Sequence, residues 1–328
     1  MRKSAIGGQG VMDGVMMRSK DVGALAVRKS SGEIETKTWP IKKRNAKILN
    51  LPIIRGVVSF VDVLIVGVGV LSDAAKMAGY DEEEYGPNKF EKFVAKKTGK
   101  SAEDIMMSFA VVIAIAISVG LFFVLPTFLT GLIHKAINST MLKNLADGGI
   151  RLLIFLLYMF AVSFIPDIKK VFRYHGAEHK TIACYEHEEE LTAANIRKHS
   201  RFHPRCGTNY LLLVMVVAMV VYSFFGWGQS IFLRMGLRLL MLPVVAGVSY
   251  EILRFLGRSD GLFARIVRWP GLQLQRMTTA EPDDDMINVA IVAFELALSE
   301  KSEEEIIRQK EQFRIPGTVP QETSDEPA

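Results

Sequence analysis

The sequence predicts a mainly α-helical, polytopic membrane protein with about four transmembrane helices, a re-entrant or interfacial helix and a small N-terminal β element. Three observations support this prediction: long uncharged apolar runs, basic residues gathered beside those runs, and an alternating pattern typical of a hairpin ahead of them. The chain has 328 residues, of which 49% are hydrophobic, and these are concentrated in a few runs instead of being spread evenly. A helix needs about 20 apolar residues to cross the hydrocarbon core of a bilayer.

Four apolar runs are candidates for crossing the membrane. The clearest extends over 105–133 and has no charged side chain. The others are predicted at 150–166, 210–225 and 231–256. The last run contains Arg234, Arg238, Glu251 and Arg254. These charges indicate a helix that packs inside the bundle or near its ends, or one that lines a transport pathway. No inverted repeat supports transport.

The distribution of lysine and arginine predicts the orientation. Basic residues are dense before residue 50, between 167 and 209, and after residue 256, whereas the two opposite loops have few. Because positive residues mark the cytoplasmic side, we expect a multi-pass protein of the bacterial inner (plasma) membrane with both termini in the cytoplasm. Its expected partners are the lipid bilayer, anionic lipid headgroups or a cytoplasmic protein. No motif indicates nucleic-acid binding.

These patterns divide the chain into six consecutive segments. They are 1–47, a cytoplasmic region with a β-hairpin; 48–104, a re-entrant or interfacial helix and a charged cytoplasmic loop; 105–166, transmembrane helices 1 and 2; 167–209, a cytoplasmic segment rich in histidine and cysteine; 210–256, transmembrane helices 3 and 4; and 257–328, a cytoplasmic helical region with a disordered tail.

The segments outside the main runs have their own signals. In residues 23–38, apolar and polar positions alternate on either side of a Ser-Ser-Gly turn. This pattern predicts the hairpin. The apolar stretch 51–71 contains Arg55, Asp62 and three glycines, and a crossing there would place the basic N-terminus outside. We therefore favour a re-entrant or interfacial helix over a fifth span. The pattern of residues 283–302 predicts an amphipathic helix. The acidic residues at its start favour the positive end of the helix dipole.

A methionine-rich stretch lies near the N-terminus. Met12, Met16 and Met17 recur at helical spacing, which favours packing in a core over soft-metal binding. The preceding glycine-rich stretch 7–10 lacks the spacing of a dinucleotide-binding loop, and a turn ahead of a small sheet is the favoured interpretation.

Histidine and cysteine gather in one place. Five of the six histidines and both cysteines lie between the second and third apolar runs: His175, His179, His187, His199, His203, Cys184 and Cys206. On a helix, His175 and His179 point the same way, so both imidazoles can reach one ion. With Glu178 they form the H-x-x-E-H order of inverzincin metallopeptidases, in which the two histidines bind zinc and the glutamate is the general base.

A catalytic zinc usually has three protein ligands and one open position. His203, Cys206 and His199 are candidates for the third ligand, with Glu251 more distant in the sequence. Nitrogen and sulfur ligands favour zinc over magnesium.

Three alternatives to this catalytic site stay open. His203 and Cys206 together with His175 and His179 would close a four-ligand structural site without catalysis. The two histidines of the motif could also be plain interfacial side chains. A cysteine nucleophile with a histidine partner is disfavoured because nothing pairs either cysteine with a fixed base.

Three motifs resemble the YqhQ-like family of bacterial membrane proteins. They are residues 7–18 (GGQGVMDGVMMR), 173–180 (RYHGAEHK) and 199–208 (HSRFHPRCGT). The likeness extends to about residue 300, with mild departures at Gly10 and Asp13, where the family most often has alanine and glutamate. The family is a domain of unknown function described as predicted metal-dependent enzymes, so the resemblance implies the membrane topology and a metal but supplies no substrate.

The predicted function is a membrane-bound, zinc-dependent hydrolase, with peptide bonds as the first substrate class and its site on the cytoplasmic face. In this hypothesis Glu178 is catalytic, His175 and His179 bind zinc, and His203 or Cys206 completes the coordination. The alternative is a non-enzymatic, metal-stabilised membrane scaffold, channel, transporter or membrane-protein biogenesis factor.

Overall fold

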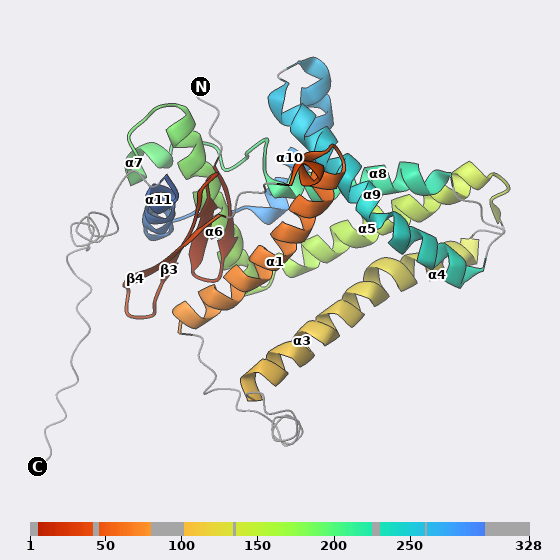
Figure 1. Ribbon diagram of the computed structural model, residues 1–328, viewed down its shortest axis with the longest axis horizontal. Helices are drawn as coiled ribbons and strands as arrows, with labels where there is room; N and C mark the ends of the chain where they lie inside the picture. The colour runs from red at the N-terminus through yellow and green to blue at the C-terminus, as the bar shows by residue number, and fades with distance from the viewer. Residues whose placement is uncertain are drawn as a thin grey trace, which may run out of the picture.

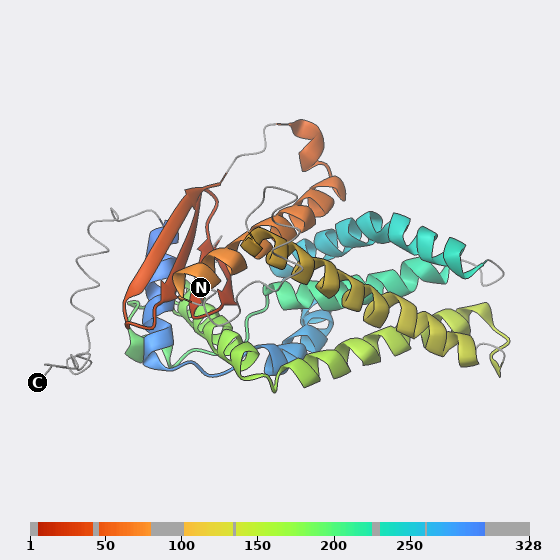
Figure 2. The same cartoon turned by 90° about the horizontal axis from the view of Figure 1, so that it is seen from below.

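A computed structural model of the chain places a bundle of long helices beside a small domain built around a β-sheet (Figure 1). It describes residues 6–41, 46–79, 102–133, 136–224, 230–259 and 261–298. In Figure 2 the long helices extend to one side, and the sheet with α11 (Asp284–Leu298) lies at the other. The predicted disordered tail lies outside the described residues.

The N-terminal sheet has four antiparallel strands in sequence order. They are β1 (Gly7–Val11), β2 (Gly14–Arg18), β3 (Val22–Arg28) and β4 (Ile34–Pro40). The predicted hairpin is confirmed as β3 and β4, with Ala26 opposite Thr36. The glycine-rich stretch is itself a strand, β1, and not only a turn ahead of the sheet.

The methionines near the N-terminus are buried, but their helical spacing is misleading. Met16 and Met17 follow one another in strand β2, so they point to opposite faces of the sheet. Met17 packs with α6 (Pro166–Glu186) and α11, whereas Met16 packs with α1 (Ile54–Met77). The expectation of core packing therefore holds for these two residues, in a strand instead of a helix.

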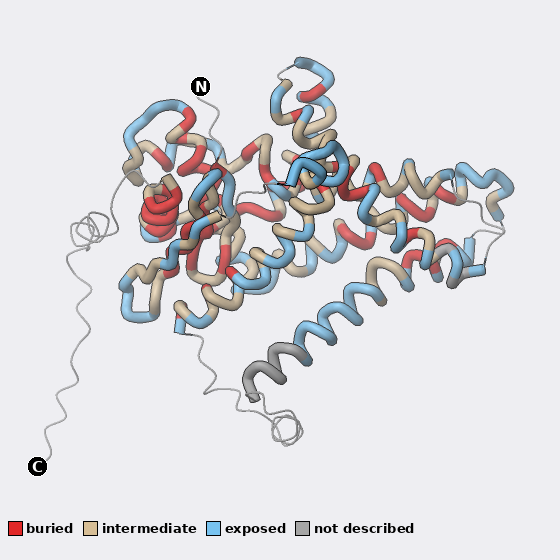
Figure 3. Tube along the Cα trace, in the orientation of Figure 1, coloured by how far each residue is buried: buried red, intermediate tan, exposed pale blue. Residues whose placement is uncertain are grey.

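Helix α11 is the centre of the small domain. It packs beside α6 on the same face of the sheet, and Figure 3 shows it buried along most of its length. Ile287, Ala290 and Phe294 are completely buried, and so are side chains on its other faces. This burial agrees with the expected amphipathic helix, because the polar residues Asn288 and Glu295, seven positions apart, are only half-buried while the apolar residues face the sheet and α6. The expected capping is present, since Asp283 Oδ1 accepts a hydrogen bond from Met286 N at 2.9 Å.

Helix α1 connects the sheet to the bundle. Its last turns pack on the sheet through Val70 and Ala74, and near its start Arg55 Nε donates to Glu251 Oε1 at 2.6 Å. The helix is unbroken over 24 residues, and the structure shows no turn that would make it re-entrant. Its length and composition would also allow it to span a membrane. Its interfacial placement therefore stays a prediction.

Four helices are long and apolar enough to cross a membrane, which agrees with the predicted number. They are Ile54–Met77, Phe109–Ile133, Thr140–Val162 and Met235–Arg258. This set includes α1 and omits α8 (Gly207–Ser223), the helix at the predicted third span, because α8 has 17 residues. The described part of α3 (Ala102–Val119) is exposed in Figure 3, and its outward side chains are apolar, as contact with lipid requires.

The helix boundaries differ from those expected in two places. The first predicted span consists of α3, a π-helical turn (η2, Gly120–Val124) and α4 (Leu125–Ile133). The second span, α5 (Thr140–Val162), begins ten residues before the predicted start and ends before Pro166, which opens α6. Pro166 lies at the first position of α6, where a missing N–H costs nothing.

Asp147 is the centre of a network of charged residues inside the bundle. Asp147 of α5 accepts from Arg151 Nε at 2.9 Å and pairs with Arg238 of α9 (Ile231–Arg258) at 2.8 Å. Thr130 Oγ1 lies 3.2 Å from the other oxygen of Asp147. Arg238 therefore packs inside the bundle, as one of the expectations for this helix stated.

Candidate metal site

One face of helix α6 presents the H-x-x-E-H motif. Residues three and four positions apart lie on the same side of a helix, so His175, Glu178 and His179 converge. Cys206 reaches this face from the N-cap position of α8, 27 residues further along the chain than His179. Glu178, His179 and Cys206 are buried, and the His175 side chain is 15% exposed.

The candidate ligand atoms form a compact group. One atom each from His175, His179 and Cys206 lies within 4.8 Å of the other two. His175 Nε2 and Cys206 Sγ are 3.3 Å apart. The two imidazole ring centres are 4.3 Å apart. Two nitrogens and one sulfur are a donor set that fits zinc, which takes N and S ligands at about 2.0–2.3 Å.

Backbone carbonyls orient both imidazoles. His175 Nδ1 lies 2.9 Å from Thr278 O, and His179 Nδ1 lies 2.5 Å from Arg201 O. If each Nδ1 carries the proton and donates to its carbonyl, each Nε2 is left with a lone pair directed at the group. Metal-binding histidines almost always show this outer hydrogen bond, which fixes the tautomer and the ring.

Glu178 lies between the two histidines. Its Oε2 is 3.8 Å from His175 Nε2 and 3.5 Å from His179 Nε2. Within the described part of the chain, this buried oxygen has no hydrogen-bond partner. Burial raises the pKa of Glu178, and the nearby His175 and His203 together with the Gly8 N–H act in the opposite direction. A buried carboxylate oxygen with no partner is costly and calls for an additional ligand or a function.

His203 lies beside this group and not in it. Its ring centre is 5.5 Å from that of His179, and its Nε2 is 3.7 Å from Glu186 Oε2. Its backbone is held on both sides by Gln275 of α10 (Leu262–Thr278), which accepts from His203 N and donates to His203 O, both at 2.8 Å. Of the two predicted alternatives for completing the coordination, the structure therefore brings Cys206 closest.

Two other candidates for the third ligand lie elsewhere. His199 Nε2 is 3.3 Å from Glu189 Oε2, in a different group at the end of α6. Glu251 pairs with Arg55 between α9 and α1. Sequence separation alone could not exclude them, because loops can return a distant residue to the site.

Three glycines allow the close packing around α6. A Cβ on Gly10 would lie 2.5 Å from the backbone of α6 at His175 N, and a Cβ on Gly8 would lie 3.0 Å from Glu178 Cγ. A Cβ on Gly176, inside the motif, would overlap the carbonyl oxygen of Ala280. The glycines of β1 and of the motif therefore let two backbone segments lie directly against the helix that bears the candidate ligands.

Sequence reasoning missed the residues that support the site from α10. Gln275 lies 72 positions after His203, and Thr278 lies 103 positions after His175. No local pattern could have identified them. The glycines of β1 were a signal of close backbone approach, but they did not indicate which element would approach.

The arginines near the start of α8 are engaged within the protein. Arg205 forms an ion pair with Glu186, and Arg201 lies over the Phe202 ring at 5.1 Å and 4.0 Å from Glu281. These two basic residues of the segment 167–209 therefore have anionic or aromatic partners within the protein.

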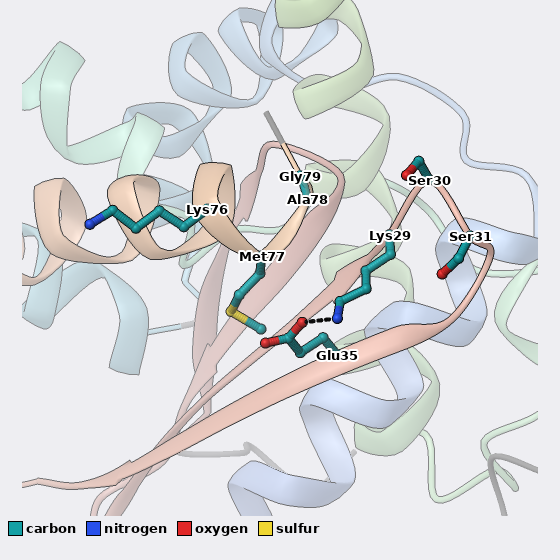
Figure 4. Close-up of a pocket in the computed structure, with 8 residues that line it drawn as sticks. All are labelled: Lys29, Ser30, Ser31, Glu35, Lys76, Met77, Ala78 and Gly79. Atoms are coloured by element: carbon teal, nitrogen blue, oxygen red, sulfur yellow. Dashed lines mark ion pairs between the residues drawn. The ribbon is translucent and has the colours of Figure 1, made fainter. Parts of the chain in front are cut away.

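A separate concavity lies at the far edge of the sheet. Figure 4 shows it between the β3–β4 turn and the end of α1, and its volume is about 410 Å³. Its charged residues include Lys29 and Glu35, which pair with each other at 2.6 Å. No residue of α6, α8 or α10 lines it. It is therefore distinct from the candidate metal site and brings together no group of metal-ligating side chains.

Comparison with known proteins identifies the family. The model of the family described as "Protein of unknown function (DUF1385)" matches residues 51–300. This chain belongs to the DUF1385 family. The DUF1385 match includes every candidate ligand and begins after the four strands.

A relative supports the same assignment. The chain is 32% identical over 298 residues to "Uncharacterized protein YqhQ" of Bacillus subtilis (strain 168), which covers 88% of this chain and 91% of the relative. The resemblance to the YqhQ-like family is thus confirmed. No solved structure matches. The descriptions of DUF1385 and of this relative name no activity.

Proposed function

We propose that this DUF1385 protein is a membrane-bound, zinc-dependent hydrolase whose site faces the cytoplasm. One observation carries the proposal: a buried carboxylate oxygen of Glu178 lies 3.5 and 3.8 Å from the Nε2 atoms of two histidines that backbone carbonyls orient. The residue order is that of an inverzincin site, in which the two histidines bind zinc and the glutamate is the general base.

In this proposal His175, His179 and Cys206 hold the ion. Zinc with three protein ligands would supply Lewis acidity to a molecule in its fourth position. The three side chains come from two elements, α6 and the N-cap of α8, so the site depends on the packing of the cytoplasmic segment against the bundle. His203 stays nearby as a group that could hold a substrate or a proton.

Glu178 is proposed as the general base. A base works best when its pKa lies near the working pH, and burial raises the pKa of this carboxyl in that direction. Its Oε2 has no hydrogen-bond partner among the described residues, so it can accept a proton without first breaking a contact. Gly8 N–H donates to the carboxylate and holds it in place.

The charges around α6 support the proposed cytoplasmic orientation. Helix α6 starts directly after α5, and its first turns contain Lys169, Lys170 and Arg173. Basic residues beside a transmembrane helix mark the cytoplasmic side, here of a bacterial inner membrane. The proposed site therefore lies close to the cytoplasmic membrane surface, where the peptide segments of membrane proteins are the first substrate class to test.

A structural metal site in a non-enzymatic scaffold is the second candidate. The burial of the candidate ligands favours a structural site, because the exposed fractions of the His175, Glu178 and His179 side chains lie between 1 and 15%. If Glu178 is itself a ligand, four protein groups would close the coordination and leave no open position. The ion would then join α6 to the start of α8 and stabilise the cytoplasmic domain.

Metal content and activity distinguish the two candidates. We would purify the full chain in detergent and compare wild type, His175→Ala, Glu178→Gln and His134→Ala, a histidine outside the cluster in sequence. The hydrolase predicts that Glu178→Gln keeps zinc at this site, that His175→Ala loses it, and that Glu178→Gln loses peptide hydrolysis. Loss of zinc in Glu178→Gln would favour the structural site, and full activity in Glu178→Gln would refute the mechanism.

A further inference from the structure

A second group of metal-ligating side chains lies at the C-terminal end of α6, outside the candidate metal site. It consists of Cys184, His187, Glu189 and His199, and we name it the α6-end cluster. We infer that the α6-end cluster binds a structural zinc ion of its own. The inference does not depend on the proposed hydrolase, because the two sites share no ligand.

Three members of the α6-end cluster already converge. One ligand atom each from Cys184, Glu189 and His199 lies within 4.8 Å of the other two. His199 Nε2 is 3.3 Å from Glu189 Oε2. Tetrahedral zinc ligands at bonds of 2.0–2.3 Å lie roughly 3.3–3.8 Å from one another, so small side-chain movements would complete the geometry.

His187 is placed to supply the fourth ligand. Its ring centre is 4.7 Å from that of His199. Its Nδ1 lies 2.7 Å from the carbonyl of Ala183, and donation of that proton would leave Nε2 with a lone pair. This is the same outer hydrogen bond that orients both histidines of the candidate metal site.

The backbone around the α6-end cluster is folded tightly about Cys184. The Cys184 carbonyl accepts hydrogen bonds from His187 N at 3.1 Å and Glu189 N at 3.2 Å, and its Sγ is directed at the Glu190 carbonyl at 3.5 Å. Glu188, between two of the proposed ligands, has a φ of 62°. A non-glycine residue in this left-handed region persists only when its surroundings hold it there. Here the end of α6 holds it, because Glu188 follows the C-cap His187 and its N–H donates to Tyr185 O at 3.0 Å. This closure of the helix end fixes the positions of Cys184 and Glu189 relative to each other.

The charges and ligand types fit a closed zinc site. A thiolate and a carboxylate would balance the two charges of zinc, and two neutral imidazoles would complete four protein ligands. Such a site leaves no open position, which makes it structural. Cys184 is completely buried, whereas His187 and Glu189 are exposed, so the ion could enter from the solvent side.

The proposed ion would stabilise the segment that shapes the candidate metal site. The chain from His187 to His199 forms a loop that contains α7 (Ala193–Ile196) and returns to Arg201, whose carbonyl orients His179. Zinc at the α6-end cluster would join the two ends of this loop. Loop closure of this kind removes conformational freedom from the unfolded chain.

The test is zinc and cobalt binding by the full chain in detergent after the metal has been removed with a chelator. We expect about two zinc ions per wild-type chain and about one in His175→Ala, in which the other site is disabled. Cobalt bound to His175→Ala should show the near-ultraviolet absorption of a thiolate ligand. Adding Cys184→Ser to His175→Ala should abolish both the remaining ion and that absorption.

Two conservative substitutions of exposed residues distinguish loss of zinc binding from loss of the fold. Glu189→Gln changes an exposed side chain and should weaken zinc binding in the His175→Ala background by at least about tenfold. Its neighbour Glu190→Gln is the matched control and should leave the affinity unchanged. The inference is overturned if His175→Ala holds no zinc, or if Glu189→Gln and Cys184→Ser both bind zinc as tightly as their parent.

Discussion

The contact between strand β1 and helix α6 gives the sharpest prediction about stability. Gly10 faces α6 so closely that a Cβ would lie 2.5 Å from both Val171 O and His175 N. All of these partner atoms belong to helix backbone, which cannot rotate away as a side chain could. We therefore expect Gly10→Ala to push β1 and α6 apart.

The size of the effect follows from the overlap. Ordinary contacts of a Cβ begin at 3.4 Å, so a contact of 2.5 Å requires a separation of about 0.9 Å. Overpacking of this kind usually costs about 1–3 kcal/mol of the free energy of unfolding. At about 2–4 °C per kcal/mol for a folding unit of 150–250 residues, the Tm should fall by about 2–12 °C.

Thermal unfolding of the detergent-solubilised chain, followed by tryptophan fluorescence, measures this change. Trp39 in β4 reports on the sheet directly. Gly7→Ala is the matched control, because it makes the same substitution in the same strand and nothing lies within 4 Å of its Cβ. Equal Tm values for Gly10→Ala and Gly7→Ala would show that β1 does not pack against α6 in this way.

Three further predictions concern the metal and the bundle. Gly176→Ala should weaken zinc binding at the candidate metal site by about 10–100-fold, because the new Cβ displaces the segment at Ala280 that orients a histidine; unchanged binding by zinc titration would contradict this. Asp147→Ala should lower the free energy of unfolding in detergent by about 3–5 kcal/mol, since Arg151 and Arg238 lose their shared buried carboxylate; a loss below 1 kcal/mol would show that the network is not buried in solution. Removal of zinc from wild type by a chelator should lower the Tm, because an ion at about 100 times its Kd stabilises by about 2.7 kcal/mol; an unchanged Tm would argue against tightly bound zinc.

The sequence predicted the local features of this protein well. The uncharged run at 105–133 and the turn at 30–32 depend on neighbours a few positions apart, and both correspond to elements of the structure. The convergence of His175 and His179 is equally local, since one helical turn separates them. The same reasoning misplaced Met16 and Met17, because a few residues at apparent helical spacing do not distinguish a helix from two strands joined by a turn.

Packing decided the environment of elements that the sequence described correctly. Helix α11 was expected to be amphipathic, and the tertiary structure shows that the sheet and α6 are the neighbours that cover its apolar side. The stretch that forms helix α1 was ambiguous between a re-entrant or interfacial helix and a fifth span, because an apolar run there contains Arg55, Asp62 and three glycines. In the structure, one end of α1 packs on the sheet and the other end pairs with Glu251 of α9, so the helix connects the sheet to the bundle.

By itself, the sequence determined the helical membrane class, the hairpin and the helical placement of the H-x-x-E-H motif, because hydrophobic runs and backbone periodicity act over short distances along the chain. Only the tertiary structure decided that Cys206 meets His175, that His203 lies to one side, and that His199 belongs to a second group. The physical reason is that such contacts join residues 10 to 103 positions apart. Their distances depend on how helices, loops and glycine-permitted close approaches pack together, which no local pattern records.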